Sequence, residues 1–242
     1  MMKVVILAGG YGSRLSEYTK TIPKPMVKVL GKPIIHRIID YYISYGYYEF
    51  YIAIGYKGQE LKKYFLKKKY PKKIKINLIE TGKNTMTGGR LKRLSSYLND
   101  TFLMTYGDGL SNVNLDKLVN FHNKNKKTFT LTAVRPPARF GVIKIKGNYV
   151  NYFKEKNNLD EGWINGGFFV IEPKFLKYLK DDSTFLEREP FEKLTKNKEL
   201  VAYKHKGFWQ CMDTLRDKEI LEIKLKEMNF LRQGKSKLKS RK

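Results

Sequence analysis

Apolar residues along the chain form short continuous runs that alternate with longer segments of helical spacing. The first run, residues 4–8, is closed by Gly9 and Gly10 and is typical of a strand buried on both faces. From residue 33 to Gly46, apolar residues recur in pairs at helical spacing, and residues 50–54 form a second apolar run. This order predicts a strand–helix–strand unit with parallel strands.

The alternation continues through the rest of the chain. Further helices are predicted over residues 59–69, 89–98 and 115–122, and further strands over residues 74–79, 101–105 and 128–134. The pattern then changes to three strands separated by short turns, at residues 141–145, 149–154 and 163–171, as in an antiparallel extension. Two helices follow at residues 174–180 and 191–196, then a strand at 200–204 and a last helix that ends near residue 228.

This order of elements predicts an α/β fold of Rossmann-like type. We expect a mostly parallel central sheet with helices on both faces and a small antiparallel extension. One domain over residues 1–230 contains all of the periodic pattern. Residues 232–242 hold six basic residues and no acidic one, so residues 231–242 are predicted to form a flexible basic tail.

Composition limits the class of protein and the charge of its expected partners. A chain of 242 residues, 41% of them hydrophobic, suits one compact domain with a sizeable core. The 49 Lys and Arg exceed the 23 Asp and Glu, and a net charge of +26 should attract nucleotides, phosphosugars or nucleic acid. Cys211 is the single cysteine, and no apolar run reaches the ~18 residues of a membrane span. The apolar start is shorter than the ~7–15 residues of a signal-peptide core, so we expect a cytoplasmic protein without membrane insertion.

A glycine-rich loop, residues 9–15, follows the first strand directly. Its backbone N–H groups can surround phosphate oxygens that no side chain could approach so closely. The loop is not a dinucleotide signature, because Leu15 stands where the third glycine belongs, and the chain has no Gly-Lys-Ser/Thr of a Walker loop. Three glycines within four residues, followed by Arg14, are more than a plain strand-to-helix turn requires. The loop therefore predicts a phosphate cradle.

Two cations accompany the loop. Arg14 lies within it, and Lys24 lies between Pro23 and Pro25, which stiffen the backbone and present the ammonium group with little loss of entropy. Together they would supply two positive charges for a triphosphate.

Residues 7–15, together with Pro23-Lys24-Pro25-Met26, resemble the signature of the sugar-phosphate nucleotidylyltransferases, which join a nucleoside triphosphate to a sugar 1-phosphate. The resemblance covers nearly all of residues 2–230 and is strongest to the glucose-1-phosphate cytidylyltransferase branch. It continues through blocks at residues 80–82, 86–93, 106–109, 162–169, 187–190 and 207–217. It implies the nucleotide-diphospho-sugar transferase fold and transfer of the cytidylyl group of CTP to glucose 1-phosphate. The products would be CDP-glucose and pyrophosphate, for the synthesis of surface polysaccharides or deoxysugars.

The resemblance also implies roles for residues of this chain. Arg14, Lys24 and Asp108 match the catalytic positions, and Asp108 and Asp213 match the family's pair of Mg²⁺ ligands. Asp108 follows the predicted strand 101–105, and ligands of open α/β sheets bind beyond the carboxyl ends of strands. Lys156 matches the lysine that holds the sugar phosphate. The other substrate positions are Leu7, Gly9, Gly10, Gly12, Ser13, Thr87, Gly88, Arg90, Tyr106, Glu155, Asn165 and Gly166.

Two of these assignments concern specificity. Glu155 and Asn165 match positions that contact sugar hydroxyls, and Arg90 matches the residue expected to select the cytosine base. The three histidines show no metal-ligand spacing, so we expect surface or satisfied-core roles for them. Cys211 stands where the family commonly has proline, and we expect it to serve packing.

Several alternatives remain open from the sequence. The same chemistry could use another nucleotide, as in uridylyl or thymidylyl transfer, or another sugar 1-phosphate. The net charge and the basic tail also suit a nucleic-acid-binding protein, although we expect no nucleic-acid partner, and a nucleotide-binding pseudoenzyme is a third possibility. The resemblance implies a homo-oligomer, but the chain lacks a long insertion before Glu80, which leaves the family's usual hexamer open.

Overall fold

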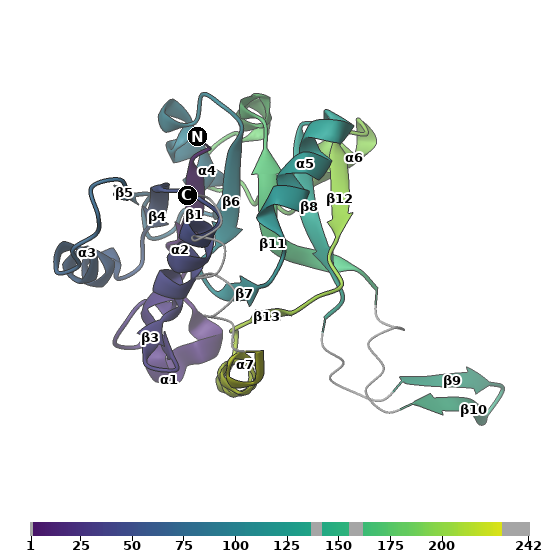
Figure 1. Ribbon diagram of the computed structural model, residues 1–242. Helices are drawn as coiled ribbons and strands as arrows, with labels where there is room; N and C mark the ends of the chain where they lie inside the picture. Colours follow the sequence, from purple (N-terminus) through teal and green to yellow (C-terminus); the bar gives the residue numbers. More distant parts are fainter. Residues whose placement is uncertain (1, 137–141, 155–161, 229–242) are drawn as a thin grey trace.

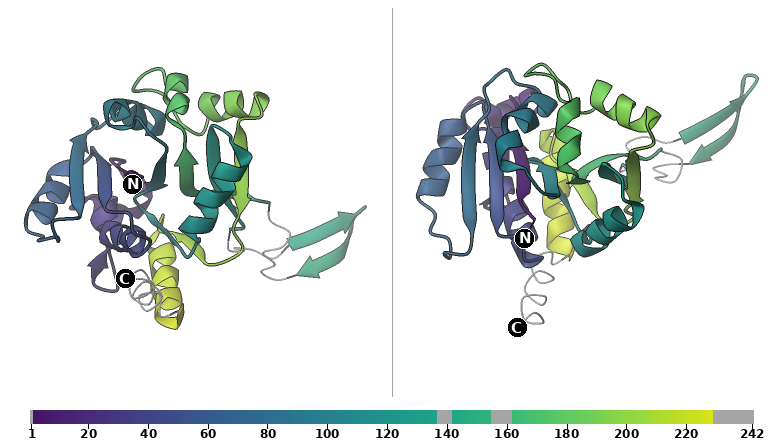
Figure 2. Two further views of the ribbon diagram at one scale, coloured as in Figure 1. Left: turned by 45° about the horizontal axis from the view of Figure 1, so that its top comes forward. Right: turned by 90° about the horizontal axis from the view of Figure 1, so that it is seen from above.

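A computed structural model describes residues 2–136, 142–154 and 162–228 (Figure 1). At its centre lies a seven-stranded sheet of order β12-β8-β11-β6-β1-β4-β5, with helices on both faces (Figure 2). The strands of this sheet are β1 (Val4–Ala8), β4 (Glu49–Ile54), β5 (Lys75–Glu80), β6 (Phe102–Tyr106), β8 (Phe129–Val134), β11 (Ile164–Ile171) and β12 (Leu200–Lys204). The predicted α/β class with a mostly parallel sheet is confirmed.

Strand β11 alone runs against its neighbours; the other six strands of the sheet share one direction. The sequence placed residues 163–171 in the antiparallel extension, and this prediction is wrong, because β11 lies inside the central sheet between β6 and β8. The physical reason is burial: residues 166–171 are all buried, and a strand covered on both faces needs a central position.

Side chains of β1 alternate between two hydrophobic clusters, one on each face of the sheet. Val4, Ile6 and Ala8 pack with residues of helices α2, α3, α5 and α7, whereas Val5 and Leu7 pack with residues of α4 and α6. All five side chains are at most 8% exposed, as the continuous apolar run predicted. The helices are α1 (Ser16–Thr19), α2 (Ile34–Ser44), α3 (Gly58–Leu66), α4 (Thr87–Arg93), α5 (Leu115–Asn125), α6 (Glu189–Lys196) and α7 (Leu215–Met228).

Two predicted helices differ in form. The helix expected over residues 174–180 is a 3₁₀ helix, η4 (Pro173–Tyr178), because Leu179 is already extended and buried in the core. The helix expected over residues 89–98 ends at Arg93 and is followed by the 3₁₀ helix η3 (Ser95–Tyr97). Two further 3₁₀ helices, η1 (Ser13–Leu15) and η2 (Lys24–Met26), carry the predicted cations Arg14 and Lys24.

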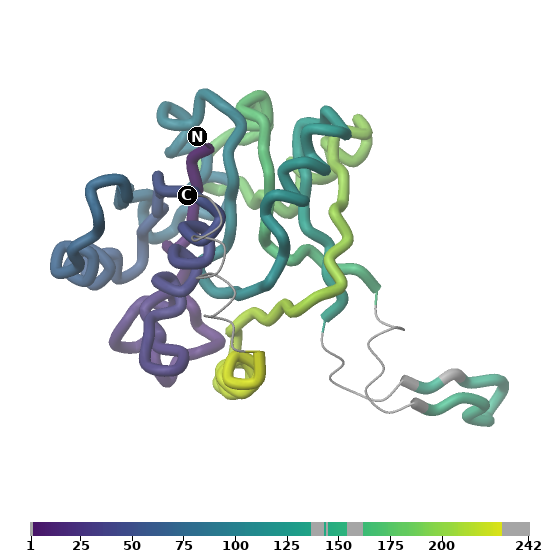
Figure 3. Tube along the Cα trace, viewed as in Figure 1, coloured from purple at the N-terminus to yellow at the C-terminus, as the bar shows by residue number. Residues whose placement is uncertain are grey.

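Three two-stranded antiparallel sheets lie outside the central sheet. They are β2 (Lys28–Val29) with β3 (Lys32–Pro33), β7 (Gly109–Ser111) with β13 (Trp209–Cys211), and β9 (Val142–Lys146) with β10 (Tyr149–Lys154). The β9–β10 hairpin is the predicted extension, and it projects away from the body (Figures 1 and 3). Within the described residues, no helix combines the length and apolar character that crossing a bilayer would require.

Glu199 joins the edge strand β12 to the start of β8, and it gives the fold a testable pH dependence. Hydrogen bonds from the Thr128 hydroxyl and, at 2.9 Å, from the Thr128 N–H lower the pKa of Glu199 to about 2, although burial opposes the shift. Because the folded pKa lies below the ordinary value, the carboxylate stabilises the fold above about pH 4.5 and loses this effect as the pH falls toward 2. Glu199→Gln should therefore lower the free energy of unfolding at pH 7 by about 1–2 kcal/mol.

Urea unfolding of both proteins between pH 7 and pH 3 measures this effect. The difference in unfolding free energy should shrink as the pH falls below 4.5. Glu192→Gln, an exposed position on α6, is the matched control and should cause little change. A difference that stays constant over this pH range would contradict the assignment.

Candidate active site

A cavity of about 570 Å³ opens at the carboxyl ends of β1 and β6. Thirteen of the predicted residues line it: Leu7, Gly9, Gly10, Gly12, Ser13, Arg14, Lys24, Thr87, Arg90, Tyr106, Asp108, Asn165 and Asp213. A second cavity of about 340 Å³ extends along the start of α7 and shares four lining residues with the first: Ile164, Trp209, Cys211 and Asp213. The topology thus places the cavity at the edge of the sheet where α/β proteins bind ligands.

The glycine loop turns sharply onto Lys24. Gly12 has a φ of +65°, and a Cβ atom at this position would lie 2.9 Å from the side chains of both Lys24 and Thr19. Thr19 donates a hydrogen bond from its hydroxyl to the carbonyl of Gly12 at 3.1 Å. Only glycine permits this combination of left-handed backbone and close approach. The loop therefore presses directly against the lysine that the sequence assigned to the triphosphate.

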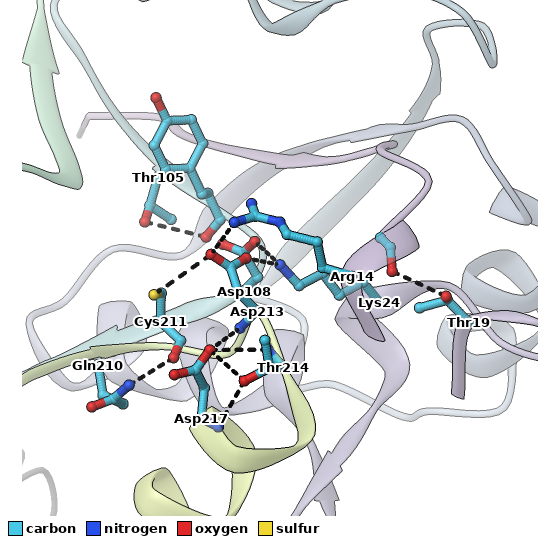
Figure 4. Close-up of polar contacts among 12 residues, drawn as sticks. Arg14, Thr19, Lys24, Thr105, Asp108, Gln210, Cys211, Asp213, Thr214 and Asp217 are labelled. Carbon is cyan, nitrogen blue, oxygen red and sulfur yellow. Dashed lines mark hydrogen bonds and ion pairs between the residues drawn. The ribbon is translucent and has the colours of Figure 1, made fainter. Parts of the chain in front are cut away.

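Lys24 lies between the two predicted metal ligands. Its Nζ donates to Oδ2 of Asp108 at 2.6 Å and to Oδ1 of Asp213 at 2.7 Å (Figure 4). Burial alone would lower the pKa of Lys24, but attraction to Asp108 and hydrogen bonds to both carboxylates outweigh it and raise the pKa above its usual value. Arg14 adds a second cation, with Nη1 3.0 Å from Oδ2 of Asp213. Two carboxylates and two cations thus converge at the mouth of the glycine loop.

Asp108 and Asp213 meet because two short strands pair behind them. Cys211 of β13 lies opposite Gly109 of β7, and the Met212 N–H donates to the Asp108 carbonyl at 2.8 Å. This small sheet brings together two aspartates that are more than a hundred positions apart in the sequence. No periodicity within the sequence could indicate the pairing, which is a tertiary contact.

The start of α7 fixes Asp213 locally. The Asp217 carboxylate accepts hydrogen bonds from the N–H groups of Asp213 at 3.2 Å and Thr214 at 3.0 Å. In return, the Thr214 hydroxyl accepts from the Asp217 N–H at 3.2 Å. This reciprocal pattern is a capping box, and its sequence signal is Thr214 followed three residues later by an acid. Asp217 was not among the predicted site residues, and its spacing from Thr214 could have identified it.

Arg90 lines the cavity beneath the glycine loop and is only 4% exposed. Its two Nη atoms donate to the carbonyls of Gly9 and Gly82 at 2.8 Å, to that of Lys83 at 3.2 Å and to the Thr81 hydroxyl at 2.7 Å. Burial lowers the pKa of Arg90. The guanidinium therefore joins the loop after β1 to the loop after β5, and its predicted role in base selection remains a prediction.

Gly9 and Gly10 provide a matched pair of substitutions. A Cβ atom at Gly9 would lie 2.1 Å from Nη1 of Arg90, which four hydrogen bonds hold in place, whereas a Cβ atom at Gly10 would meet nothing within 4 Å. We expect Gly9→Ala to lower the free energy of unfolding by roughly 2 kcal/mol and Gly10→Ala to leave it nearly unchanged. Thermal denaturation measures both, and equal melting temperatures of the two variants would contradict the close packing described here.

Asn165, at an irregularity near the start of β11, lines another part of the cavity. The Asn165 side chain accepts a hydrogen bond from the Gly167 N–H at 2.9 Å, and the Trp209 indole N–H donates to the Gly166 carbonyl at 2.7 Å. Tyr106 packs so closely that a Cβ atom at Gly167 would lie 2.5 Å from its ring. Trp209 lines both cavities and is a site residue that the sequence analysis missed, although it lies within the motif at residues 207–217.

Glu187 holds the segment before α6 beside this part of the cavity. Its carboxylate accepts hydrogen bonds from the hydroxyl groups of Tyr106 and of Thr87, the latter at 2.7 Å. Burial and then the Glu187 carboxylate raise the pKa of Tyr106 well above its usual value, so the phenol remains protonated. Two predicted substrate residues are thereby linked through a residue to which the sequence assigned no role.

The remaining predicted residues lie elsewhere or outside the described ranges. Gly88, a residue of α4, packs closely against the Thr184 carbonyl, and the Gly166 carbonyl accepts a hydrogen bond from Trp209. Neither glycine is among the residues that line the cavity. Glu155 and Lys156 fall outside the described residues. Burial, and to a smaller extent repulsion from the nearby aspartates, raises the pKa of Cys211 to about 12. Its thiol is therefore protonated at neutral pH.

The donor set suits a hard cation. Within residues 2–136, 142–154 and 162–228, no group of three or more His, Cys, Asp or Glu side chains could hold a metal ion. Asp108 and Asp213 nevertheless direct oxygens at one cationic group, Lys24. Mg²⁺ typically takes one or two protein carboxylates and completes its shell with water and substrate phosphates. The two aspartates fit that requirement.

Comparison with known proteins gives a consistent result. A family model described as nucleotidyl transferase matches residues 3–224. Glucose-1-phosphate cytidylyltransferase of Salmonella typhimurium is 43% identical over 91% of this chain and 95% of its own. Probable glucose-1-phosphate cytidylyltransferase of Bacillus subtilis is 41% identical over 92% of this chain and 94% of its own. The crystal structure of HddC from Yersinia pseudotuberculosis superposes with a TM-score of 0.74 at 25% identity, covering 93% of this chain and all of HddC.

Proposed function

The chain belongs to the nucleotidyl transferase family, and we propose that it transfers the cytidylyl group of CTP to glucose 1-phosphate, giving CDP-glucose and pyrophosphate. The observation that carries the proposal is the convergence of Lys24, Arg14 and two aspartates on the glycine loop (Figure 4). The cytidylyltransferase relatives, matched over nearly their whole length, supply the identity of the two substrates.

The reaction requires two anions to approach each other. A phosphate oxygen of glucose 1-phosphate attacks the α-phosphorus of CTP, the new O–P bond forms, and the bond to the bridging oxygen of pyrophosphate breaks. No general base is needed, because the sugar phosphate is already ionised at neutral pH. The protein's task is to position both phosphates and to offset their repulsion. Backbone N–H groups of the glycine loop and the cations Arg14 and Lys24 serve this purpose.

Asp108 and Asp213 are the residues that would hold Mg²⁺. The ion would neutralise charge on the triphosphate during transfer. On the protein side, Lys24 keeps the carboxylates close together before substrates bind, and its raised pKa keeps it charged at neutral pH. The closely packed Gly12 holds the loop against this lysine.

The sugar side of the site is proposed from the resemblance. Lys156 would hold the phosphate of glucose 1-phosphate, and Glu155 and Asn165 would contact the sugar hydroxyls. The Asn165 side chain lies on the cavity wall, fixed by its bond to Gly167. Lys156→Ala should raise the KM for glucose 1-phosphate by at least about tenfold and leave the KM for CTP nearly unchanged. Initial rates with each substrate varied in turn measure this separation, and equal changes in both constants would contradict the role.

A substrate panel tests the proposed function directly. Pyrophosphate release is measured with Mg²⁺, glucose 1-phosphate and, separately, CTP, UTP, dTTP and ATP. We expect CTP to give the highest kcat/KM. Faster release with UTP or dTTP would keep the chemistry and change the nucleotide, whereas no release with any triphosphate and several hexose 1-phosphates would refute the enzymatic proposal.

We also propose a homo-oligomer. Ile145 with Val150 and Ile143 with Phe153 are cross-strand pairs of the β9–β10 hairpin, and all four side chains are 48–65% exposed. A two-stranded hairpin is marginally stable in water on its own, so covering it with a second copy would stabilise it. Light scattering of the purified chain and of a Val150→Lys, Phe153→Lys variant tests this. A mass of one chain for the unmodified protein would contradict it.

A further inference from the structure

Many lysines lie at the end of α3 and in the segment that leads from it to β5, the edge strand of the central sheet (Figure 1). Residues 62–75, from the end of α3 to the start of β5, contain eight lysines and no acidic residue. Lys62 and Lys63 form ion pairs with Glu80 and Glu60. The other six have no ion-pair partner in the described part of the chain and are exposed: Lys67, Lys68, Lys69, Lys72, Lys73 and Lys75. We call these six lysines, together with Leu66, the lysine surface.

Leu66 is the apolar member of this surface. Its side chain is 85% exposed, the largest fraction among the exposed large hydrophobic residues of the described chain. The other apolar residues of the same helix, Leu61 and Phe65, are buried in the core at 0% and 8% exposure. Leu66 therefore contributes nothing to the core and presents an aliphatic side chain beside a run of exposed lysines, of which Lys68 and Lys73 lie over the rings of Tyr64 and Tyr48.

We propose that the lysine surface binds the face of an anionic phospholipid bilayer. Lysine ammonium groups would contact the lipid phosphates, and Leu66 would enter the boundary between headgroups and acyl chains. Clustered lysines near a membrane act together, and an adjacent apolar side chain adds affinity that charge alone does not supply. The partner is defined by this pairing of positive charge with one exposed aliphatic group.

The same residues argue against nucleic acid as the partner. Single strands are held by exposed aromatic rings and duplexes by guanidinium groups, among other contacts. Tyr64 and Tyr70 are only partly exposed and pack against the core, and residues 62–75 contain no arginine. An exposed leucine gains no favourable contact from a phosphate backbone, whereas it can insert at the boundary between the headgroups and acyl chains of a bilayer.

The lysine surface lies at the end of the sheet opposite the active site. Lys75 opens β5 beside Glu49, the first residue of β4, whereas the glycine loop follows the carboxyl end of β1. Helix α3 begins just after the carboxyl end of β4 and ends at Leu66 (Figure 1). Strands of five or six residues separate the two ends by roughly 18 Å. A chain bound to a bilayer through this surface would keep the mouth of the active site open to small substrates.

Vesicle sedimentation of the full chain tests the proposal. Vesicles of phosphatidylcholine with 30 mol % phosphatidylglycerol are compared with pure phosphatidylcholine at about 0.1 M salt. We expect binding only to the anionic vesicles, with a steep loss as salt is raised. Replacing Lys67, Lys68, Lys69 and Lys72 by Gln should weaken binding by on the order of a hundredfold. Leu66→Ser should weaken it by roughly tenfold at unchanged charge.

Matched controls separate this surface from total charge. Replacing four exposed lysines on and beside α5 and α6 by Gln (Lys117, Lys124, Lys126 and Lys196) removes the same charge elsewhere and should preserve most of the binding. Ile223→Ser is the matched control for Leu66→Ser, because it removes another exposed aliphatic side chain, 56% exposed, from α7. The far-UV circular dichroism spectrum and the melting temperature should be unchanged in all variants, which verifies folding without relying on the proposed activity.

Three outcomes would overturn the proposal: no binding to anionic vesicles, equal loss of binding in the surface and control variants, or insensitivity to Leu66→Ser. Tighter binding to a random-sequence single-stranded DNA than to the vesicles, with the same lysines required, would assign the surface to nucleic acid instead. None of these results depends on the proposed nucleotide chemistry, so the two proposals fail separately.

Discussion

Asp108→Asn is expected to reduce the rate of pyrophosphate release by at least roughly a thousandfold. Asp108 is one of only two carboxylates that meet at Lys24, and the described residues offer no third acidic, histidine or cysteine ligand there. An amide oxygen carries no net charge, so the site would lose half of its anionic ligand set. Binding of a cation and neutralisation of the triphosphate should both fail.

The assay is pyrophosphate release at saturating CTP and glucose 1-phosphate over a series of Mg²⁺ concentrations. Asp100→Asn is the matched control: Asp100 is exposed and lies before the opposite end of the same strand, β6. It should retain nearly the full rate. Far-UV circular dichroism verifies that both variants fold. Near-normal turnover of Asp108→Asn would remove the aspartate pair from the proposed mechanism.

Lys24→Met should have the second-largest effect, and it separates the structural from the catalytic role of the lysine. Without the ammonium group, Asp108 and Asp213 repel each other, and Arg14 contacts Asp213 but not Asp108 among the ion pairs of the described residues. Loss of one partner from a largely buried ionic cluster lowers the free energy of unfolding, here by about 2–3 kcal/mol. Turnover should fall by on the order of a hundredfold, because a cation that faces the phosphates is lost.

Magnesium distinguishes these two effects. In Lys24→Met, added Mg²⁺ should raise the melting temperature by more than it does in the unmodified chain, because the ion replaces a missing positive charge between the carboxylates. The activity should not return, since Lys24 also serves the triphosphate. Lys20→Met, at an exposed position of the same loop region, should change neither property. An equal Mg²⁺ effect on both chains would show that the aspartates do not share a cation.

Much of the fold could be predicted because its signals are local. The apolar run of β1 and the paired spacing in α2 are visible within ten or so residues, and the structure confirms both. The position of β11 between β6 and β8 could not be predicted, because the order of strands in a sheet depends on how all strands compete for buried positions. The same limit applies to η4, where a buried Leu179 overrides the helical spacing before it.

The candidate site divides in the same way. The glycine loop, Arg14 and Lys24 lie within sixteen consecutive residues, and their chemistry can be recognised from residue types alone. Asp213 was assigned only through the family resemblance, because nothing near it in the sequence indicates that β13 will pair with β7. Trp209 and Glu187 were missed for the same reason: each acts by holding a residue distant in the sequence.

Residue identities established the kinds of group available: a backbone cradle for phosphate, fixed cations, acidic side chains and an excess of positive charge. These follow from residue identity and short-range spacing, which need no knowledge of the rest of the chain. Which groups face one another depends on the folded chain, which places one lysine between two aspartates and an arginine beneath the loop. Such contacts join segments whose proximity results from the burial of apolar surface over the whole domain, and no local pattern encodes that sum.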